Sequence, residues 1–321
     1  MDKGLLEKYA GAAAAYSVRL LDRNYTGPIF KIRRVDVVSS QSNGEIFVFP
    51  DDEGWISVDS KVIDPSNASS ATVLGEFVNA QSYTQADSSS IGSNPQHAFV
   101  SIWKDQSGNA NDASQSTANN QPKIYDATTG VITDNGKPTV EFSTAGNSKL
   151  VFTQISDIQT IFTVRSSSGV QSRSNFMGAS GTNDYRSSSG ALLSSSAASY
   201  VTGGNNYING TLTTYTTTAK PTTQSLFTMI HSSASGRSDQ LTQDRSNSVR
   251  SWDGPFSEIV IYRYDESDNR AVIEDDINKA LIFTRMPQTQ RKIASWVNTQ
   301  EQPLLILPET LQDKANNHCL K

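Results

Sequence analysis

The stretch AFVSIWKDQSG, residues 98–108, decides the fold, because an alternating apolar run ends in a tryptophan and passes at once into a turn. Successive side chains of a β-strand point to opposite faces. Ala98 and Val100 therefore face one way, whereas Phe99 and Trp103 face the other. Apolar residues on both faces predict a central strand that is covered on both sides.

The tetrapeptide DQSG, residues 105–108, has the composition of a type I turn. Asp105 stands at the first position, where its carboxylate can accept a hydrogen bond from an N–H two residues on, and Gly108 stands at the fourth. Asp105, Asn109 and Asp112 are weak candidates for a structural calcium site. Because the ligand order of an EF-hand is missing, we expect structural turns here, no metal site and no cofactor.

Period-two patterns recur through the chain and predict further strands. Asn-Gly pairs at 135–136 and 209–210 are typical of two-residue hairpin turns. A chain of 321 residues can bury one large core, so we predict a mainly β protein built as a β-sandwich. The segments with this pattern include IFKIRRV, EIFVF, PTVEF, IQTIFTV, LFTMI and FSEIVIY.

Two helices are expected beside the strands. An N-terminal helix over residues 4–21 is indicated by apolar side chains at spacings of three and four, and it should pack on the sandwich. Near the end, Ser267 is a candidate N-cap for a short helix that stops before Pro287. The apolar positions of the first helix are Leu5, Tyr9, Ala12, Tyr16 and Leu20.

The last 37 residues, 285–321, change in character and are too few to bury a core of their own. We expect an extended C-terminal tail that works as an assembly arm, and a sandwich domain over residues 1–284. The residues predicted to make the assembly contacts are Trp296, Leu304, Leu305, Ile306 and Leu307.

Composition argues against several classes of function. No window approaches the roughly 20 continuous apolar residues of a bilayer helix, so membrane insertion is not expected. The start of the chain lacks the features of a signal peptide, and Cys319 is the only cysteine, which rules out an intramolecular disulfide. A net charge of −5 argues against a nucleic-acid partner, and we expect the basic cluster of Lys31, Arg33 and Arg34 to be solvated or ion-paired.

Three segments together carry a family resemblance: GAAAAYSVRLLDRNYTGPIFKIRR, WKDQSGNANDASQSTANNQPKIYD and DNGKPTVEF. They resemble a recurring bacteriophage virion domain, which is similar to the catalytic domain of fungal-type α-L-arabinofuranosidase B. The resemblance covers about residues 8 to 284 and is most specific at 25–28, 33–34 and 105–108. It implies a concanavalin A-like, laminin G-like jelly-roll sandwich.

The chain departs from the glycosidase where catalysis is concerned. The glycosidase places its nucleophilic glutamate after paired cysteines, but the nearest segment, SNFMGASGTNDYR at 174–186, has neither cysteine nor glutamate. Glycoside hydrolysis usually needs two carboxyl groups. His97, His231 and His318 show no metal-binding spacing, and no nucleophile elbow or phosphate-binding loop is present. We therefore predict that the chain is not an enzyme.

The resemblance implies a non-enzymatic structural component of a phage virion, located in a tail, fibre or capsid-surface appendage. Such a component assembles in the host cytoplasm with other virion proteins, as a homo-oligomer, and can attach to host-surface glycans. A glycan-binding receptor module is the alternative, and a residual glycoside hydrolase is the third hypothesis. Aromatic rings stack on sugars, so the candidate glycan contacts are Tyr185, Tyr200, Tyr207 and Trp252.

Overall fold

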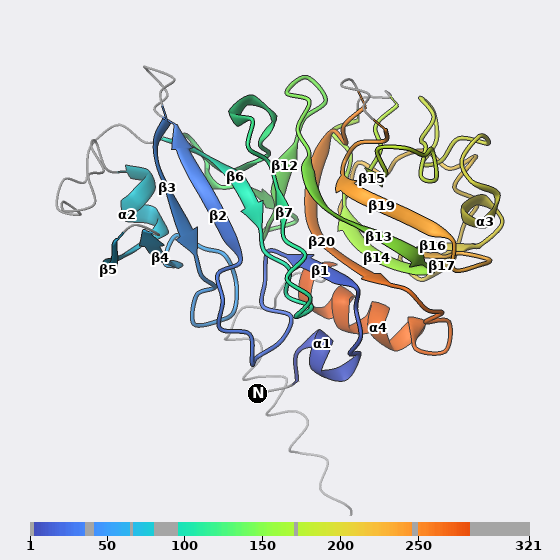
Figure 1. Cartoon of the computed structure of the whole chain (residues 1–321), viewed down its shortest axis with the longest axis horizontal. Coiled ribbons are helices and arrows are strands. Elements are labelled where there is room, and N and C mark those ends of the chain that lie inside the picture. Colours follow the sequence, from blue (N-terminus) through green and yellow to red (C-terminus); the bar gives the residue numbers. More distant parts are fainter. Residues whose placement is uncertain are drawn as a thin grey trace, which may run out of the picture. The chain divides into compact units, whose positions relative to one another are not determined.

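The computed structural model describes residues 3–35, 42–64, 67–79, 96–169, 173–245 and 250–282. Paired strands dominate, and every ladder between them is antiparallel. All ladders except that of β10 and β11 form one continuous network that folds back into two layers (Figure 1). The prediction of a mainly β sandwich with few helices is confirmed.

The first layer is built around β20, Gly254–Tyr262, which is paired along both edges. One edge is taken by β14 and the other is shared by β1 and β12. From β14 the layer continues through β18 and β16 to β17. The bounds are β1 Ala14–Ser17, β12 Val140–Phe142, β14 Thr160–Arg165, β16 Asn205–Ile208, β17 Thr211–Leu212 and β18 Ser225–Ile230.

The second layer runs from β5 through β4, β3 and β2 to β6, and then through β7 and β13 to β19 and β15. Strand β8 pairs with both β6 and β12 and so joins the two layers at one end. The bounds are β2 Phe30–Val35, β3 Ser42–Val48, β4 Lys61–Asp64, β5 Asn67–Val73, β6 His97–Trp103, β7 Ala113–Ser114, β8 Lys123–Asp126, β13 Leu150–Ile158, β15 Met177–Gly178 and β19 Gly236–Leu241.

The remaining elements are short. Strand β9 pairs with β8, and β10 pairs with β11 in a separate hairpin. Among the described residues, no helix is long and apolar enough to cross a membrane. The bounds are β9 Gly130–Val131, β10 Thr133–Asp134, β11 Lys137–Pro138, α1 Leu5–Lys8, α2 Leu74–Asn79, α3 Ser199–Thr202, α4 Arg270–Ile277 and the short helices η1 Ala118–Asn120 and η2 Asn278–Ile282.

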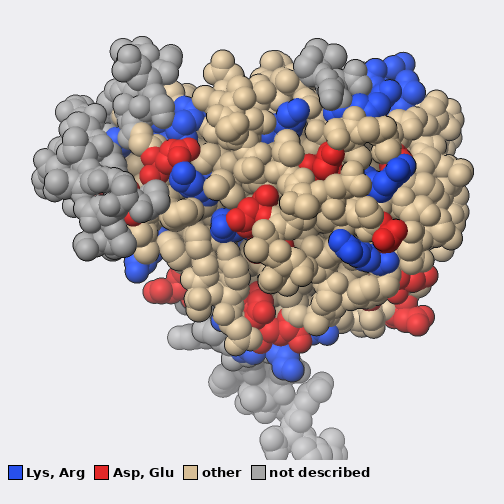
Figure 2. Space-filling view, viewed as in Figure 1, with Lys and Arg blue, Asp and Glu red and all other residues tan. Residues whose placement is uncertain are grey.

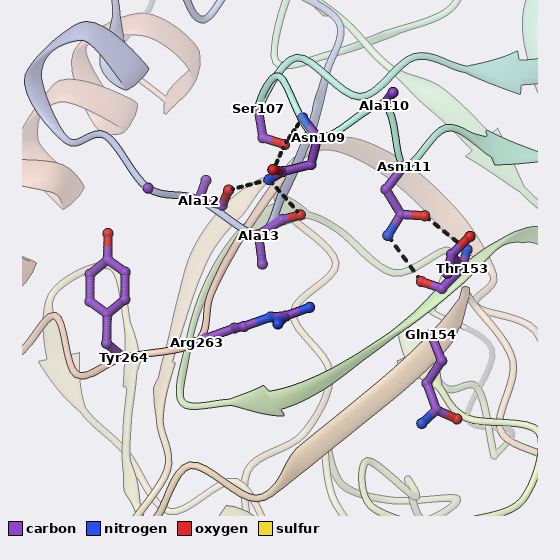
Figure 3. A pocket seen from close by; sticks show the side chains of 11 residues that line it. Ala12, Ala13, Ser107, Asn109, Ala110, Asn111, Thr153, Gln154, Arg263 and Tyr264 are labelled. Carbon is purple, nitrogen blue, oxygen red and sulfur yellow. Dashed lines mark hydrogen bonds between the residues drawn. The ribbon is translucent and has the colours of Figure 1, made fainter.

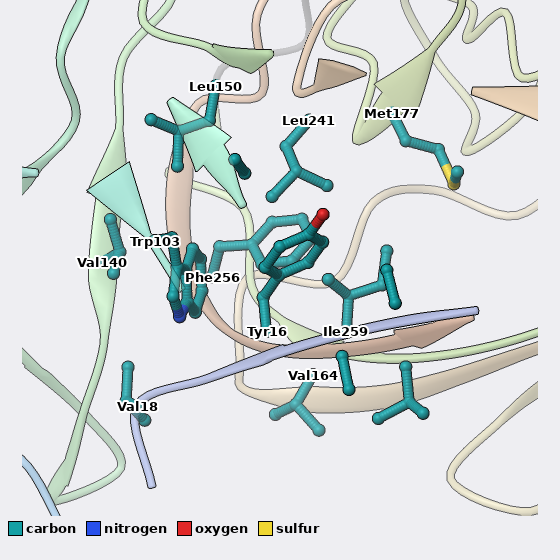
Figure 4. Close-up of a cluster of buried hydrophobic side chains, with 14 of the residues drawn as sticks. Tyr16, Val18, Trp103, Val140, Leu150, Val164, Met177, Leu241, Phe256 and Ile259 are labelled. Carbon is teal, nitrogen blue, oxygen red and sulfur yellow. The ribbon is translucent and has the colours of Figure 1, made fainter. Parts of the chain in front are cut away.

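The core between the layers contains a cluster of buried rings around Trp103 (Figure 4). The Trp103 ring lies 5.4 Å from Phe30, 6.2 Å from Tyr16 and 6.3 Å from Phe256, measured between ring centroids. Its indole N–H donates a hydrogen bond of 3.1 Å to the carbonyl of Ser17. Trp103 therefore ties β6 to β1 as well as filling the core.

Strand β6 is central, as predicted, but its alternation breaks at Ser101. The partners of Lys31 and Ile32 are Ile102 and Val100, so Ser101 is an extra residue in the ladder. This bulge moves Trp103 onto the buried face that Val100 occupies, whereas the prediction put Trp103 on the opposite face from Val100. Sequence alternation alone cannot show such a one-residue insertion.

The N-terminal helix predicted over residues 4–21 is wrong in extent. Only one turn, α1, is helical, and the alanine run enters β1, which pairs with β20. The helix ends at its C-cap, Tyr9, and Gly11 follows with a φ of +89°, a value that favours glycine. Ala14 and Ala15 are fully buried, and the packing of small side chains against the core outweighs the helix propensity of alanine.

The short helix near the end is confirmed as α4, although it begins later than predicted. Asn269 is the N-cap, and the Ser267 N–H donates to Asp265 Oδ1 at 2.8 Å in a preceding turn. The assembly arm at 285–321 lies outside the described residues. The same holds for its predicted contacts, Trp296, Leu304, Leu305, Ile306 and Leu307.

Candidate functional site

The loop after β6 is anchored by Asp105, whose side chain is almost completely buried. Its Oδ1 accepts hydrogen bonds from the backbone N–H groups of Ala15 and Ser107, both at 2.9 Å. Its Oδ2 accepts from the Ser107 hydroxyl at 2.8 Å and from the Asn111 N–H at 3.0 Å. Asp105 thus fixes the shape of the loop and joins it to β1.

The other two weak calcium candidates are also engaged in the loop. Asp112 accepts a hydrogen bond from the Asp105 N–H at 3.0 Å and forms an ion pair with Lys104. The Asn109 amide donates to the carbonyl of Ala12 at 2.9 Å. The carboxylates face N–H donors instead of a common point, and the described part of the chain holds no cluster of three metal-ligating side chains.

A hollow of about 580 Å³ lies beside this loop, and we call it the loop hollow (Figure 3). Its walls are the loop itself, the segment before β1, part of β13 and the residues that follow β20. The described residues that line it include no Asp or Glu. They are Gly11, Ala12, Ala13, Ser107, Asn109, Ala110, Asn111, Thr153, Gln154, Arg263 and Tyr264.

Three exposed side chains give the loop hollow its chemical character. Arg263 lies below Ala13 in Figure 3 and points toward the side of Thr153 and Gln154, and no ion pair joins it to a carboxylate in the described ranges. Tyr264 is 42% exposed and donates a hydrogen bond of 2.6 Å to the carbonyl of Ala10. Gln154 presents an exposed amide from β13. A cation, a phenol ring and an amide therefore surround one space.

The opposite wall of the loop hollow is held rigidly. The Asn111 amide donates to the Thr153 carbonyl at 2.9 Å, and the Thr153 N–H donates to Asn111 Oδ1 at 2.8 Å. These two hydrogen bonds join the loop to the edge of β13. The Asn111 and Thr153 part of the lining is therefore held by hydrogen bonds within the chain.

A second hollow of about 500 Å³, the sheet hollow, lies where β6, β8, β12 and β20 meet. It is lined by the carboxylates of Glu141 and Asp253 and by the half-buried ring of Phe99. Glu141 is paired with Pro255 in the ladder between β12 and β20, and Asp253 directly precedes β20. Asp253 accepts a hydrogen bond of 3.0 Å from the Thr144 N–H.

Two of the four predicted glycan contacts are core residues. Tyr185 is fully buried, with its ring 5.7 Å from Phe176 and 5.5 Å from His231. Trp252 is 1% exposed, and the guanidinium of Arg165 lies 4.2 Å from its ring centroid. Neither ring leaves a face for a sugar, which corrects the prediction for both residues.

The other two predicted contacts are half-buried. The Arg270 guanidinium lies 4.1 Å from the Tyr207 ring centroid, and the Tyr200 ring packs at 5.7 Å against His231. Neither tyrosine lines the loop hollow or the sheet hollow. The four aromatics therefore do not form one binding surface in the structure.

The basic cluster of β2 makes intramolecular contacts. Lys31 pairs with Glu45 at 2.5 Å, Arg33 donates to Gln121 at 2.7 Å, and Arg34 is buried beside Phe77. On the face shown in Figure 2, acidic and basic side chains lie interspersed over most of the described surface.

Comparison with known proteins gives a limited result. No family model matches the chain, and no curated protein matches it. Similar solved structures include a mutant of GH54 α-L-arabinofuranosidase soaked with 4-nitrophenyl α-L-arabinofuranoside, with a TM-score of 0.44 and 14% identity. A GH54 α-L-arabinofuranosidase soaked with a cyclic sulfate inhibitor has a TM-score of 0.45 and 13% identity. An arabinofuranosidase complexed with arabinofuranosyl-α-1,2-xylobiose has a TM-score of 0.44 and 14% identity.

Each match covers 86% of this chain and 64% of the other, so the chain spans less than two thirds of these structures. The prediction of a chain that is not an enzyme is contradicted, because all three similar structures are arabinofuranosidases, and we withdraw it. Similarity at this level assigns no catalytic residue.

Proposed function

We propose that this protein binds glycans and that the loop hollow is the binding site. The observation that carries the proposal is that exposed Arg263, Gln154 and Tyr264 line one polar hollow. Amide and guanidinium groups donate hydrogen bonds to sugar hydroxyls, and a phenol ring can pack against the C–H face of a sugar. Ligand sites in general combine a concave shape with a few placed polar groups.

The rigidity of the loop adds to the proposal. Asp105 and the Asn111–Thr153 pair hold the backbone of the loop in place, so little backbone entropy is lost when a ligand enters. A sugar that binds a protein exchanges its hydrogen bonds with water for hydrogen bonds with the protein, so the net gain from each is small. A preformed site is therefore the arrangement that a glycan-binding protein needs.

The biological setting that we propose is a phage virion, where the chain serves in a tail, fibre or capsid-surface appendage. The support is the sequence resemblance to a phage virion domain. In that setting the loop hollow attaches the particle to host-surface glycans, and other virion proteins and further copies of the chain are its partners. Immunogold labelling of purified phage particles with an antibody against the chain tests this setting, and unlabelled particles would contradict it.

The test of glycan binding is an array screen with the wild type and two single variants, each checked for folding by circular dichroism. Gln154→Ala and Tyr264→Ala should lose binding, because both remove groups that line the loop hollow. Phe99→Ala is the matched control, because it changes the sheet hollow alone. Loss of binding in the Phe99 variant with retention in the other two would place the site elsewhere.

A second candidate function is glycoside hydrolysis in the sheet hollow, favoured by its two carboxylates. One carboxyl group donates a proton to the leaving oxygen, and the other acts as nucleophile or base, at a separation of roughly 5 to 9 Å. Release of 4-nitrophenol from a panel of aryl glycosides tests this. Glu141→Gln and Asp253→Asn should each lower the rate by about 100-fold or more, whereas Arg263→Gln should not. Equal rates in all variants would refute the assignment.

A further inference from the structure

We infer that the loop hollow selects acidic glycans, in which a sugar carries a carboxylate, over their neutral counterparts. The inference rests on the proposed glycan binding and names the ligand class for the same site. Its basis is an exposed arginine, Arg263, in a hollow whose described lining contains no Asp or Glu. A cation without a counter-charge in a concave polar site favours an anionic ligand.

The acidic residues that follow Arg263 in the sequence accept hydrogen bonds from other groups. Asp265 accepts a hydrogen bond of 2.8 Å from the Ser267 N–H, in the turn before α4. Glu266 is buried and accepts a hydrogen bond of 2.8 Å from the Asn269 amide. Both carboxylates therefore hold the turn together, and no ion pair between either of them and Arg263 occurs in the described structure.

The nearest buried acid behind the loop is also saturated. All four hydrogen bonds to the Asp105 carboxylate come from the loop and β1, and Asp105 itself does not line the loop hollow. The lining that faces the ligand is made of amides, hydroxyls, alanines and the guanidinium. An incoming carboxylate meets hydrogen-bond donors and no opposing negative charge.

The shape of the guanidinium group fits this ligand class. Its planar fork can donate two parallel hydrogen bonds to one carboxylate, a geometry that a lysine ammonium cannot reproduce. Gln154 and Tyr264 flank Arg263 and can contact the hydroxyls and the C–H face of the same sugar (Figure 3). The carboxylate sets the orientation of the sugar, and Gln154 and Tyr264 contact the rest of its ring.

The experiment is isothermal titration with two matched ligand pairs. One pair is an oligogalacturonide and its fully methyl-esterified form, and the other is sialyllactose and lactose. The acidic member of at least one pair should bind about tenfold or more tightly, and the pair that shows this identifies the acid as a uronic or a sialic acid. Arg263→Gln should remove the difference, and Arg263→Lys should restore only part of it.

Arg173→Gln is the control, because it takes the same charge from an exposed arginine that does not line the loop hollow. Equal binding of acidic and neutral members would overturn the inference while leaving glycan binding intact. A loss in Arg173→Gln as large as that in Arg263→Gln would also overturn it, since the preference would then follow net charge. No binding of any member, with no array signal, would refute the proposed function as well.

Discussion

Replacing Asp105 with alanine tests whether the loop after β6 is structural. The substitution removes the acceptor for three backbone N–H groups and one hydroxyl. The N–H of Ala15 is the most costly of these, because Ala15 is fully buried in β1 and water cannot replace the lost acceptor. The half-exposed loop around Ser107 and Asn111 can take up water in part.

The magnitude follows from these contacts. A buried donor left without a partner costs roughly 1–3 kcal/mol, and the partly hydrated donors add less than that each. We expect Asp105→Ala to lower the free energy of unfolding by about 3–5 kcal/mol. Asp112→Ala is the matched control in the same loop. It removes one backbone acceptor and a half-exposed ion pair, so its cost should be about 1 kcal/mol.

Urea unfolding followed by tryptophan fluorescence measures both variants, since Trp103 and Trp252 are buried and report on the core. The Asp105 variant should unfold at a clearly lower urea concentration than the Asp112 variant, with an unchanged m-value. A cost below 1 kcal/mol for Asp105→Ala, or equal costs for the two variants, would refute a structural role for this carboxylate.

Three further predictions concern stability. Burial lowers the pKa of His231 to about 4, while its hydrogen bond to the Ile158 carbonyl acts in the opposite direction. Because the folded-state pKa lies below the unfolded value, the contribution of neutral His231 to stability is fully present above about pH 6.5. The free energy of unfolding should fall by on the order of 3 kcal/mol as the pH drops toward 4. His231→Gln should flatten this dependence when unfolding is measured across an acid pH series. Arg165→Met should leave the midpoint of thermal unfolding unchanged or raise it, because burial lowers the pKa of Arg165 to about 9 and the buried guanidinium has no carboxylate partner in the described structure. A drop of more than about 4 °C, which corresponds to a loss of roughly 1–2 kcal/mol, would contradict this. Gly11→Ala should cost roughly 1–2 kcal/mol in urea unfolding and weaken glycan binding, since Gly11 has positive φ and a Cβ there would lie 2.5 Å from the Tyr264 hydroxyl; full stability would contradict it.

The strands were predictable from the sequence because their alternation is local. IFKIRRV carries the alternating burial pattern of β2 in its own residues, whereas FSEIVIY is buried along its whole length in β20. The alanine run before Tyr16 was wrongly predicted as helix because its structure depends on a distant strand. Its helix propensity is local, whereas its place in β1 depends on β20, more than 240 residues away along the chain. The bulge at Ser101 likewise depends on the register against β2.

The candidate site could be predicted only in part. The turn role of Asp105 is visible in DQSG, because the side chain bonds an N–H two residues on. The loop hollow is not visible, since Asn109, Gln154 and Arg263 come from three separate segments that only the fold brings together. Aromatics in polar loops suggested a binding surface, yet Tyr185 and Trp252 turn inward because these loops pack on the core.

The most direct test of glycan recognition by the loop hollow is a crystal structure of the protein soaked with the acidic oligosaccharide that binds best in solution. The expected result is sugar density in the loop hollow, with the carboxylate on Arg263 and a ring against Tyr264. Density in the sheet hollow, or at any site that Arg263 does not contact, would contradict the assignment.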